Sequence, residues 1–356
     1  MICLCGSHSI GEIICTSHSI AEIRFTSSSF PVLRTSNKCV YWTVKVEALR
    51  HHFMGGSARF VAAWNVVSSI CLVIVNKWIF SSSETISVVG LTAVHFLVTT
   101  IAVRFAGTVG VFPIVPVAYR SAVMVGLGRA LSVVCMNANL MLNTISLYQL
   151  SKIAVLPVVI VAKSCQAQPL SLEKTIACLL TTMGIGVATI SHPTLTLSGS
   201  LVALAAVLST VVAVLTGESM VKGLGLSSLQ MMYVEMPIST LLVFFAIPFF
   251  EDTRLLRDTI VEMEAPVAIA IGLSTIGAIC VNVSGFMTVT RLSAIGYLMC
   301  GHLKTTLLLV WGLWIESNAP TELYVGSAMA LLGLWRYFHA DAASKTETGR
   351  TEKKVA

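Results

Sequence analysis

The sequence contains few charged residues. Asp, Glu, Lys and Arg make up only 11% of its 356 residues, whereas soluble domains carry about 25%. Hydrophobic residues make up 55%, and the mean hydropathy is +0.84. Helices of a soluble protein need polar faces, which are missing here. The composition therefore indicates a polytopic membrane protein.

The sequence also lacks the short motifs of common enzyme and metal sites. It has no HExxH, no GxSxG, no Walker-type phosphate loop and no Cys/His spacing of a zinc site. Its ten cysteines include no CxxC pair. These absences disfavour a membrane enzyme, a bound metal and a cofactor. The net charge of +6 comes largely from loops and tails, so it bears on topology and does not indicate nucleic-acid binding.

The apolar runs are long enough for ten membrane-spanning helices, since one span needs roughly 20 mostly apolar residues. We expect an all-α membrane protein in which halves of about 58–192 and 199–340 form one domain, followed by a polar tail at 341–356. The predicted spans are 58–80, 86–105, 120–142, 143–166, 174–192, 199–220, 228–250, 265–288, 293–316 and 320–340.

Basic residues are unevenly distributed between the predicted loops. Cytosolic loops are enriched in Lys and Arg. With ten spans, both termini and every second loop lie on one side, and that side carries most of the basic residues. In the opposite loops, Arg254 and Arg257 are outnumbered by acidic residues. We therefore predict that both termini are cytosolic.

The two ends of the chain differ from the apolar part. Residues 1–57 are rich in Ser and Thr, and SHSIGEII is echoed there by SHSIAEIR. A disordered extension is favoured over a transit peptide, and a start at Met54 stays open. The chain ends with Lys353 and Lys354 before Val-Ala. This resembles the dilysine retrieval signal that a vesicle coat reads on cytosolic tails; a plain charged tail is the alternative.

Three basic residues lie well inside predicted spans: Arg129, Lys152 and Lys304. A central Lys or Arg costs roughly 2.5–3.5 kcal/mol on insertion scales, and the two lysines lie too deep to reach the interface. Glu235 is the one clear carboxylate inside a span, so positive charge is in surplus. A mid-membrane cavity for an anion such as phosphate explains this surplus. The alternative is a structural pair between Glu235 and a lysine.

Polar side chains accompany both lysines. Tyr148 lies four residues before Lys152, and Tyr297 lies seven before Lys304, so each tyrosine shares a helix face with its lysine. Such groups also form hydrogen bonds between membrane helices, so both roles stay open. The other polar residues near the lysines are Asn139, Asn143, His302 and Thr305.

The lysines lie in the fourth and ninth predicted spans, five spans apart. A repeat of five spans is inverted across the membrane, and proteins of this design bind substrate at the repeat interface near the midplane. We therefore predict two inverted five-helix repeats. The glycines expected to allow close helix packing are Gly184, Gly186, Gly272, Gly277, Gly326 and Gly333.

Several stretches resemble a known family. NKWIF (76–80), LTAVHFLVT (91–99), the run 137–157 and GHLKT (301–305) are similar to the nucleotide-sugar and triose-phosphate transporters of the drug/metabolite transporter superfamily. The most similar branch has Lys-Thr in span nine and includes UDP-sugar transporters and members of solute carrier family 35. The resemblance covers about residues 58–340.

This resemblance implies alternating access and exchange of a nucleotide sugar, with UDP-sugars favoured, for a nucleoside monophosphate in Golgi or endoplasmic reticulum membranes. Plastid sugar-phosphate relatives bind phosphate through lysines that match Lys152 and Lys304. Thr305 and Val281 stand where those relatives have an arginine and a tyrosine, which favours nucleotide sugars. Lys77, within NKWIF, is a further candidate substrate contact.

The chain departs from this branch at several positions. The branch commonly reads SPVTYQVLGHLKT where this chain has SAIGYLMCGHLKT, with Ala294, Gly296 and Leu298 as replacements. The sugar therefore stays open. Arg129 and Glu235 are not expected from the branch; they either tune selectivity, with Arg129 as a substrate contact, or pair with each other.

Alternative functions are a phosphate antiporter of the plastid envelope and a non-transporting membrane scaffold. A homodimer also stays open.

Overall fold

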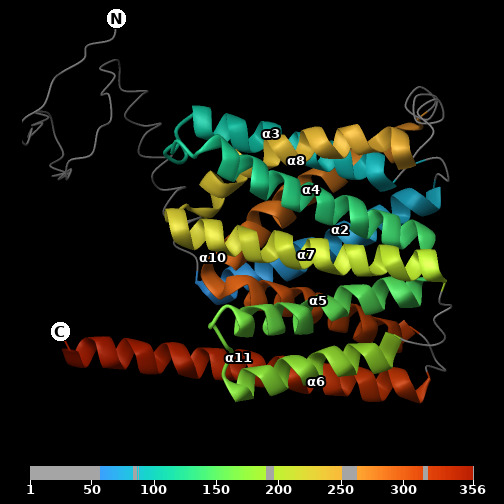
Figure 1. Ribbon diagram of the computed structural model, residues 1–356. Coiled ribbons are helices and arrows are strands. Elements are labelled where there is room, and N and C mark those ends of the chain that lie inside the picture. The colour runs from blue at the N-terminus through green and yellow to red at the C-terminus, as the bar shows by residue number, and fades with distance from the viewer. Residues whose placement is uncertain are drawn as a thin grey trace, which may run out of the picture. The chain divides into compact units, whose positions relative to one another are not determined.

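The structure is a computed structural model, and it describes residues 57–82, 86, 88–189, 196–250, 263–315 and 320–355. Every regular element in this part of the chain is an α-helix (Figure 1). The helices are α2 (Ala58–Ser82), α3 (Val88–Thr108), α4 (Tyr119–Leu142), α5 (Ile145–Cys165), α6 (Leu172–Thr189), α7 (Leu197–Leu224), α8 (Ser228–Phe250), α10 (Ala265–Ile315) and α11 (Thr321–Val355).

Eight of these helices, all except α11, are long and apolar enough to cross a membrane. Their bounds lie within a few residues of the predicted spans, because runs of about 20 apolar residues separated by polar stretches define spans well. The all-helical membrane architecture expected from the sequence is thereby confirmed. The last helix, α11, continues through the predicted polar tail to Val355.

The longest helix, α10, is broken at Ser293. This residue has φ 75° and ψ 173°, which is not helical. A positive φ is uncommon for a residue other than glycine. The break divides α10 into a first segment (265–292) and a second segment (294–315), at the junction of the eighth and ninth predicted spans. It sets the direction of the second segment, which carries Tyr297, His302 and Lys304.

The helices pack around α4 and α10. Helix α4 contacts both α7 and α8, and α10 contacts α2 and α3. Helices α3 and α8 lie side by side at one edge, and α6 and α11 lie side by side at the other (Figure 1). Polar side chains join neighbouring helices inside this apolar structure. Asn65 donates to Ser284 at 3.0 Å between α2 and α10, and Ser132 bonds to Thr210 at 2.9 Å between α4 and α7.

Glycines bring α6 and α11 into close contact. A Cβ atom added at Gly184 would lie 2.4 Å from the backbone nitrogen of Ala330, and one at Gly326 would lie 2.5 Å from the nitrogen of Ala188. The expectation of close packing is therefore confirmed for these two glycines. It is wrong for Gly272, where a Cβ would meet nothing within 4 Å. An apolar sequence does not show which face of a helix meets a neighbour.

Some sequence predictions fall outside the described residues. These are the extension at 1–57 apart from Ser57, the loop with Arg254 and Arg257, and the side chains of Lys353 and Lys354.

Comparing a glycine in close contact, Gly184, with one beside open space, Gly272, tests the α6–α11 packing. Gly184→Ala should lower the free energy of unfolding by about 1–3 kcal/mol, the usual cost of overpacking, because backbone atoms of α11 cannot yield. Gly272→Ala should cause no loss, since alanine favours helices over glycine and space is open. Chemical unfolding in detergent micelles measures both. Equal effects of the two substitutions would contradict this packing.

Candidate functional site

The two predicted lysines lie together. Lys152 is on α5 and Lys304 is on the second segment of α10, and both side chains are half-buried. The ammonium group of Lys152 is 5.2 Å from the centroid of the Tyr148 ring, a cation–π contact. Its charge also acts on Lys304 and on His302. Helices α5 and α10 are in contact, so residues about 150 positions apart in the sequence form one cluster.

Within the described residues, this lysine cluster has no acidic partner. None of the four ion pairs in the described part of the chain includes Lys152 or Lys304. Two ammonium groups near each other, in helices that are otherwise apolar, repel each other and lack a counter-charge. An anion placed between them would relieve both effects.

Two further candidates on α10 lie beside Lys304. The His302 side chain is 6% exposed, and its Nε2 atom has no hydrogen-bond partner among the described residues. A buried polar atom without a partner is costly, so this nitrogen is available to a ligand or to water. The Thr305 hydroxyl donates to the carbonyl of Gly301 at 3.2 Å, which leaves its lone pairs able to accept a hydrogen bond.

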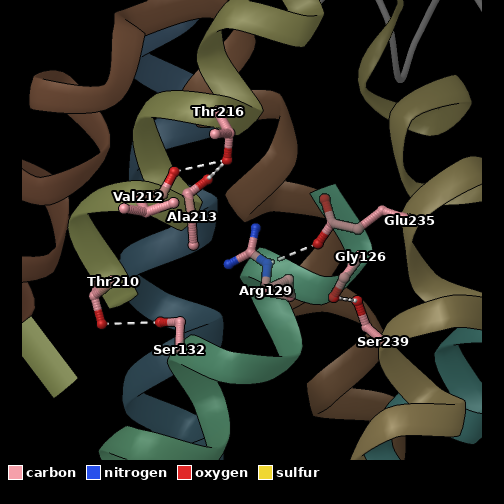
Figure 2. A network of polar contacts seen from close by, with 9 residues as sticks. All are labelled: Gly126, Arg129, Ser132, Thr210, Val212, Ala213, Thr216, Glu235 and Ser239. Atoms are coloured by element: carbon pink, nitrogen blue, oxygen red, sulfur yellow. Dashed lines mark hydrogen bonds and ion pairs between the residues drawn. The ribbon is translucent and has the colours of Figure 1, made fainter. Parts of the chain in front are cut away.

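Arg129 differs from the two lysines because it has a carboxylate partner. Its Nε donates to Oε1 of Glu235 at 2.8 Å, and Glu235 is 1% exposed (Figure 2). The guanidinium also lies 5.0 Å from the centroid of the Phe286 ring and interacts with Tyr297. The Arg129 side chain remains 29% exposed. The buried acid is therefore used by Arg129 and not by a lysine.

The surroundings of Arg129 hold α4 against α7 and α8. Figure 2 shows Ser239 of α8 donating to the carbonyl of Gly126 on α4, at 3.1 Å. A Cβ at Gly126 would lie 2.7 Å from Ile238, so the two backbones approach closely there. Arg129 of α4 and Glu235 of α8 therefore form their ion pair where these two helices pack closely together.

The remaining candidates lie in other surroundings. The Asn143 amide donates to Oδ1 of Asn139 at 2.8 Å and to the carbonyl of Gly199 at 2.9 Å, so both asparagines join the end of α4 to the start of α7. Lys77 is exposed on α2, and none of the described ion pairs includes it.

Sequence reasoning missed an ionic network between helix ends. Glu218 of α7 bonds to Lys163 of α5 and to Lys222, at 2.7 Å each, and Lys174 of α6 bonds to Asp341 of α11 at 2.8 Å. Glu218 and Asp341 also line a pocket of 290 Å³ beside the break in α10. The four-residue spacing of Glu218 and Lys222 was the available signal. This pocket does not include the lysine cluster.

Removing one partner from the Arg129–Glu235 pair should be costly. Glu235→Leu leaves a partly buried cation unpaired and should lower the free energy of unfolding by about 2–3 kcal/mol, less than the cost for a fully buried pair. The double variant Arg129→Met, Glu235→Leu should recover more than half of that loss. Thr216→Val is the control, because its hydroxyl bonds only within α7, and it should change stability by about 0.5 kcal/mol or less. Additive effects in the double variant would show that the two residues are not coupled.

The chain is similar to plant transporters over most of its length. No family model matches it. It is 27% identical to UDP-xylose transporter 1 of Arabidopsis thaliana over 292 residues, with 81% of this chain and 85% of the relative covered. It is 27% identical to UDP-rhamnose/UDP-galactose transporter 2 of the same plant, with 78% and 82% covered.

A solved crystal structure also matches, with a TM-score of 0.60 and 15% sequence identity. The match covers 79% of this chain and 96% of that one. At this identity the match shows a shared fold alone. The sequence relatives confirm the resemblance found in the motifs: the chain is a homologue of the nucleotide-sugar transporters.

Proposed function

We propose that this protein carries a nucleotide sugar, with UDP-sugars favoured, across a membrane. The observation that carries the proposal is the lysine cluster, Lys152 with Lys304, which lies within two membrane helices without an acidic partner. The named relatives support it, because they are UDP-xylose and UDP-rhamnose/UDP-galactose transporters and not enzymes.

The diphosphate of the substrate binds between Lys152 and Lys304. Lysine is a compact cation whose three N–H donors suit phosphate oxygens. His302 Nε2, when it carries the ring proton, donates to a phosphate oxygen beside Lys304. The Thr305 hydroxyl, whose proton is donated to the Gly301 carbonyl, accepts a hydrogen bond from a hydroxyl of the sugar. Tyr148 contacts the Lys152 ammonium through its ring, so it orients that lysine and presents an aromatic face to the substrate.

A nucleoside monophosphate returns through the same site. An empty cluster would hold two uncompensated cations, and this penalises a conformational change without cargo. A monophosphate supplies negative charge for the return step. The anion requirement thus couples entry of the sugar nucleotide to exit of the monophosphate.

The transport cycle uses two inverted halves of five spans each, α2–α6 and α7–α11, with α10 counted as two spans. The helix contacts support this division. Contacts of α4 with α7 and α8 correspond, five spans along, to contacts of α10 with α2 and α3, and the α5–α6 contact corresponds to that of α10 with α11. The proposed ten spans count α10 as two, divided at its break at Ser293, and include α11. Proteins of this design alternate access by movement of one half against the other.

The ionic network closes one end of this arrangement. Lys163–Glu218 ties α5 to α7, and Lys174–Asp341 ties α6 to α11. Each pair joins a helix of the first half to a helix of the second half. Opening at this end therefore requires these pairs to separate, and the network contributes to the barrier between the two access states.

The distribution of basic residues supports a cytosolic location for both termini. A Golgi or endoplasmic reticulum membrane is the proposed location, with Lys353 and Lys354 available to a vesicle coat. The runner-up function is exchange of phosphate for sugar phosphates, as in a plastid envelope. A homodimer and a non-transporting scaffold are also consistent with the sequence, and the experiment below separates the scaffold from the transporter.

Uptake into proteoliposomes tests the function. Vesicles preloaded with UMP should take up labelled UDP-xylose, UDP-rhamnose or UDP-galactose, whereas vesicles preloaded with GMP, CMP or AMP should not. Lys152→Gln and Lys304→Gln should each reduce the initial rate about tenfold or more, since a hydrogen bond to a charged group contributes about 1.5–3 kcal/mol. The control is Arg120→Gln, which removes an exposed arginine near the start of α4 that takes part in none of the described ion pairs, and it should keep the rate.

Three results would contradict parts of this proposal. Uptake into empty vesicles at the full rate would exclude obligatory exchange. Exchange of phosphate for triose or hexose phosphate, with no exchange of nucleotides, would establish the runner-up function. Unchanged rates in both lysine variants would show that the lysine cluster does not bind the substrate.

A further inference from the structure

A groove distinct from the lysine cluster is lined by residues of α11, the second segment of α10 and the beginning of α2. It has a volume of 470 Å³. Its apolar wall includes Leu331, Leu334, Trp335 and Phe338 of α11 and Leu303 of α10, and Arg59 of α2 also lines it. Leu331 and Trp335 are exposed, so the groove opens on the outer surface of the described helices.

The groove has the depth of one leaflet. Along α11 it extends from Ala342 to Leu331, which is about 16 Å at the helical rise of about 1.5 Å per residue. Half of a bilayer's hydrocarbon core is about 15 Å thick. One acyl chain that enters from the membrane surface would therefore reach the end of the groove near the midplane.

The charge at the groove is positive. Arg59 is the second residue of α2 and is exposed, and none of the ion pairs in the described part of the chain includes it. No acidic residue lines the groove. His339 stacks on Trp335 with ring centroids 5.7 Å apart, and tryptophan is typical of the level of the lipid headgroups. A cation above an apolar channel suits an anionic amphiphile.

We propose that this groove binds an anionic phospholipid. Its acyl chain lies along Leu331, Leu334 and Phe338, and its phosphate and acidic headgroup bind Arg59. Arg59 is the selective element, because the apolar wall accepts any acyl chain. A juxtamembrane arginine attracts anionic lipid by about 1 kcal/mol, which corresponds to an approximately fivefold preference over a zwitterionic lipid with the same chains.

Native mass spectrometry of the full chain, delipidated in detergent, tests this binding. The probes are phosphatidylserine and phosphatidylcholine with identical acyl chains. Wild-type protein should bind phosphatidylserine about fivefold better. Arg59→Glu should abolish that preference, and Arg336→Glu, which changes an exposed arginine of α11 outside the groove, should keep it.

A second pair of variants tests the acyl-chain channel. Leu331→Trp fills the groove and should remove one bound lipid of either kind, whereas Leu332→Trp should not, because Leu332 is also exposed on α11 but does not line the groove. Leu303 also lines the groove, but a substitution there could disturb its neighbours His302 and Lys304 in the lysine cluster. The test therefore leaves Leu303 unchanged.

Other outcomes would overturn the proposal. Equal loss of preference in Arg59→Glu and Arg336→Glu would indicate surface charge without a site. Binding that occurs only after removal of residues 1–53 would make that segment the occupant. A dimer that Leu331→Trp converts to monomer, with no lipid bound in wild type, would make a second copy the occupant.

Discussion

Lys152 and Lys304 have no acidic partner in the part of the chain that the structure describes, and this is the constraint on which the rest of the structure depends. Two cations that share an apolar region repel each other. Two neighbouring side chains contact or lie beside these cations. Tyr148 offers a ring to one ammonium group, and the unpartnered Nε2 of His302 lies beside the other. In the proposed function, a bound anion supplies the missing negative charge.

Arg129 shows what the same charge does when a carboxylate is present. Its pairing with Glu235 satisfies the acid and fixes the distance between α4 and α8. The three cations inside the helices are alike in the sequence, yet in the described part of the chain one forms an ion pair between helices and two do not. A buried ion pair is costly to break, which suits the packing role of Arg129 and Glu235. An unpaired charge is costly to keep, which suits the ligand-binding role proposed for Lys152 and Lys304.

The spans and the lysine cluster could be predicted from the sequence, and much of the side-chain pairing could not. Hydropathy locates helices because a bilayer requires about 20 apolar residues per span. The family motifs indicated that Lys152 and Lys304 belong together. Hydropathy does not determine, however, how each helix is rotated about its own axis, and so which side chains face its neighbours. It could not show that Gly272 faces open space, or that Glu218 reaches Lys163 on another helix.

The second segment of α10 connects these features mechanically. It begins at the break at Ser293, carries His302 and Lys304, and presents Leu303 between them to the groove beside α11. A helix held at one end by a sharp break moves mainly by rotation about that end. Rotation of this segment would move Lys304 relative to Lys152 and reshape the apolar groove at the same time. If the proposed anion site and the proposed lipid groove are both correct, they share this segment, and lipid in the groove and anion in the site would each favour particular positions of the same helix.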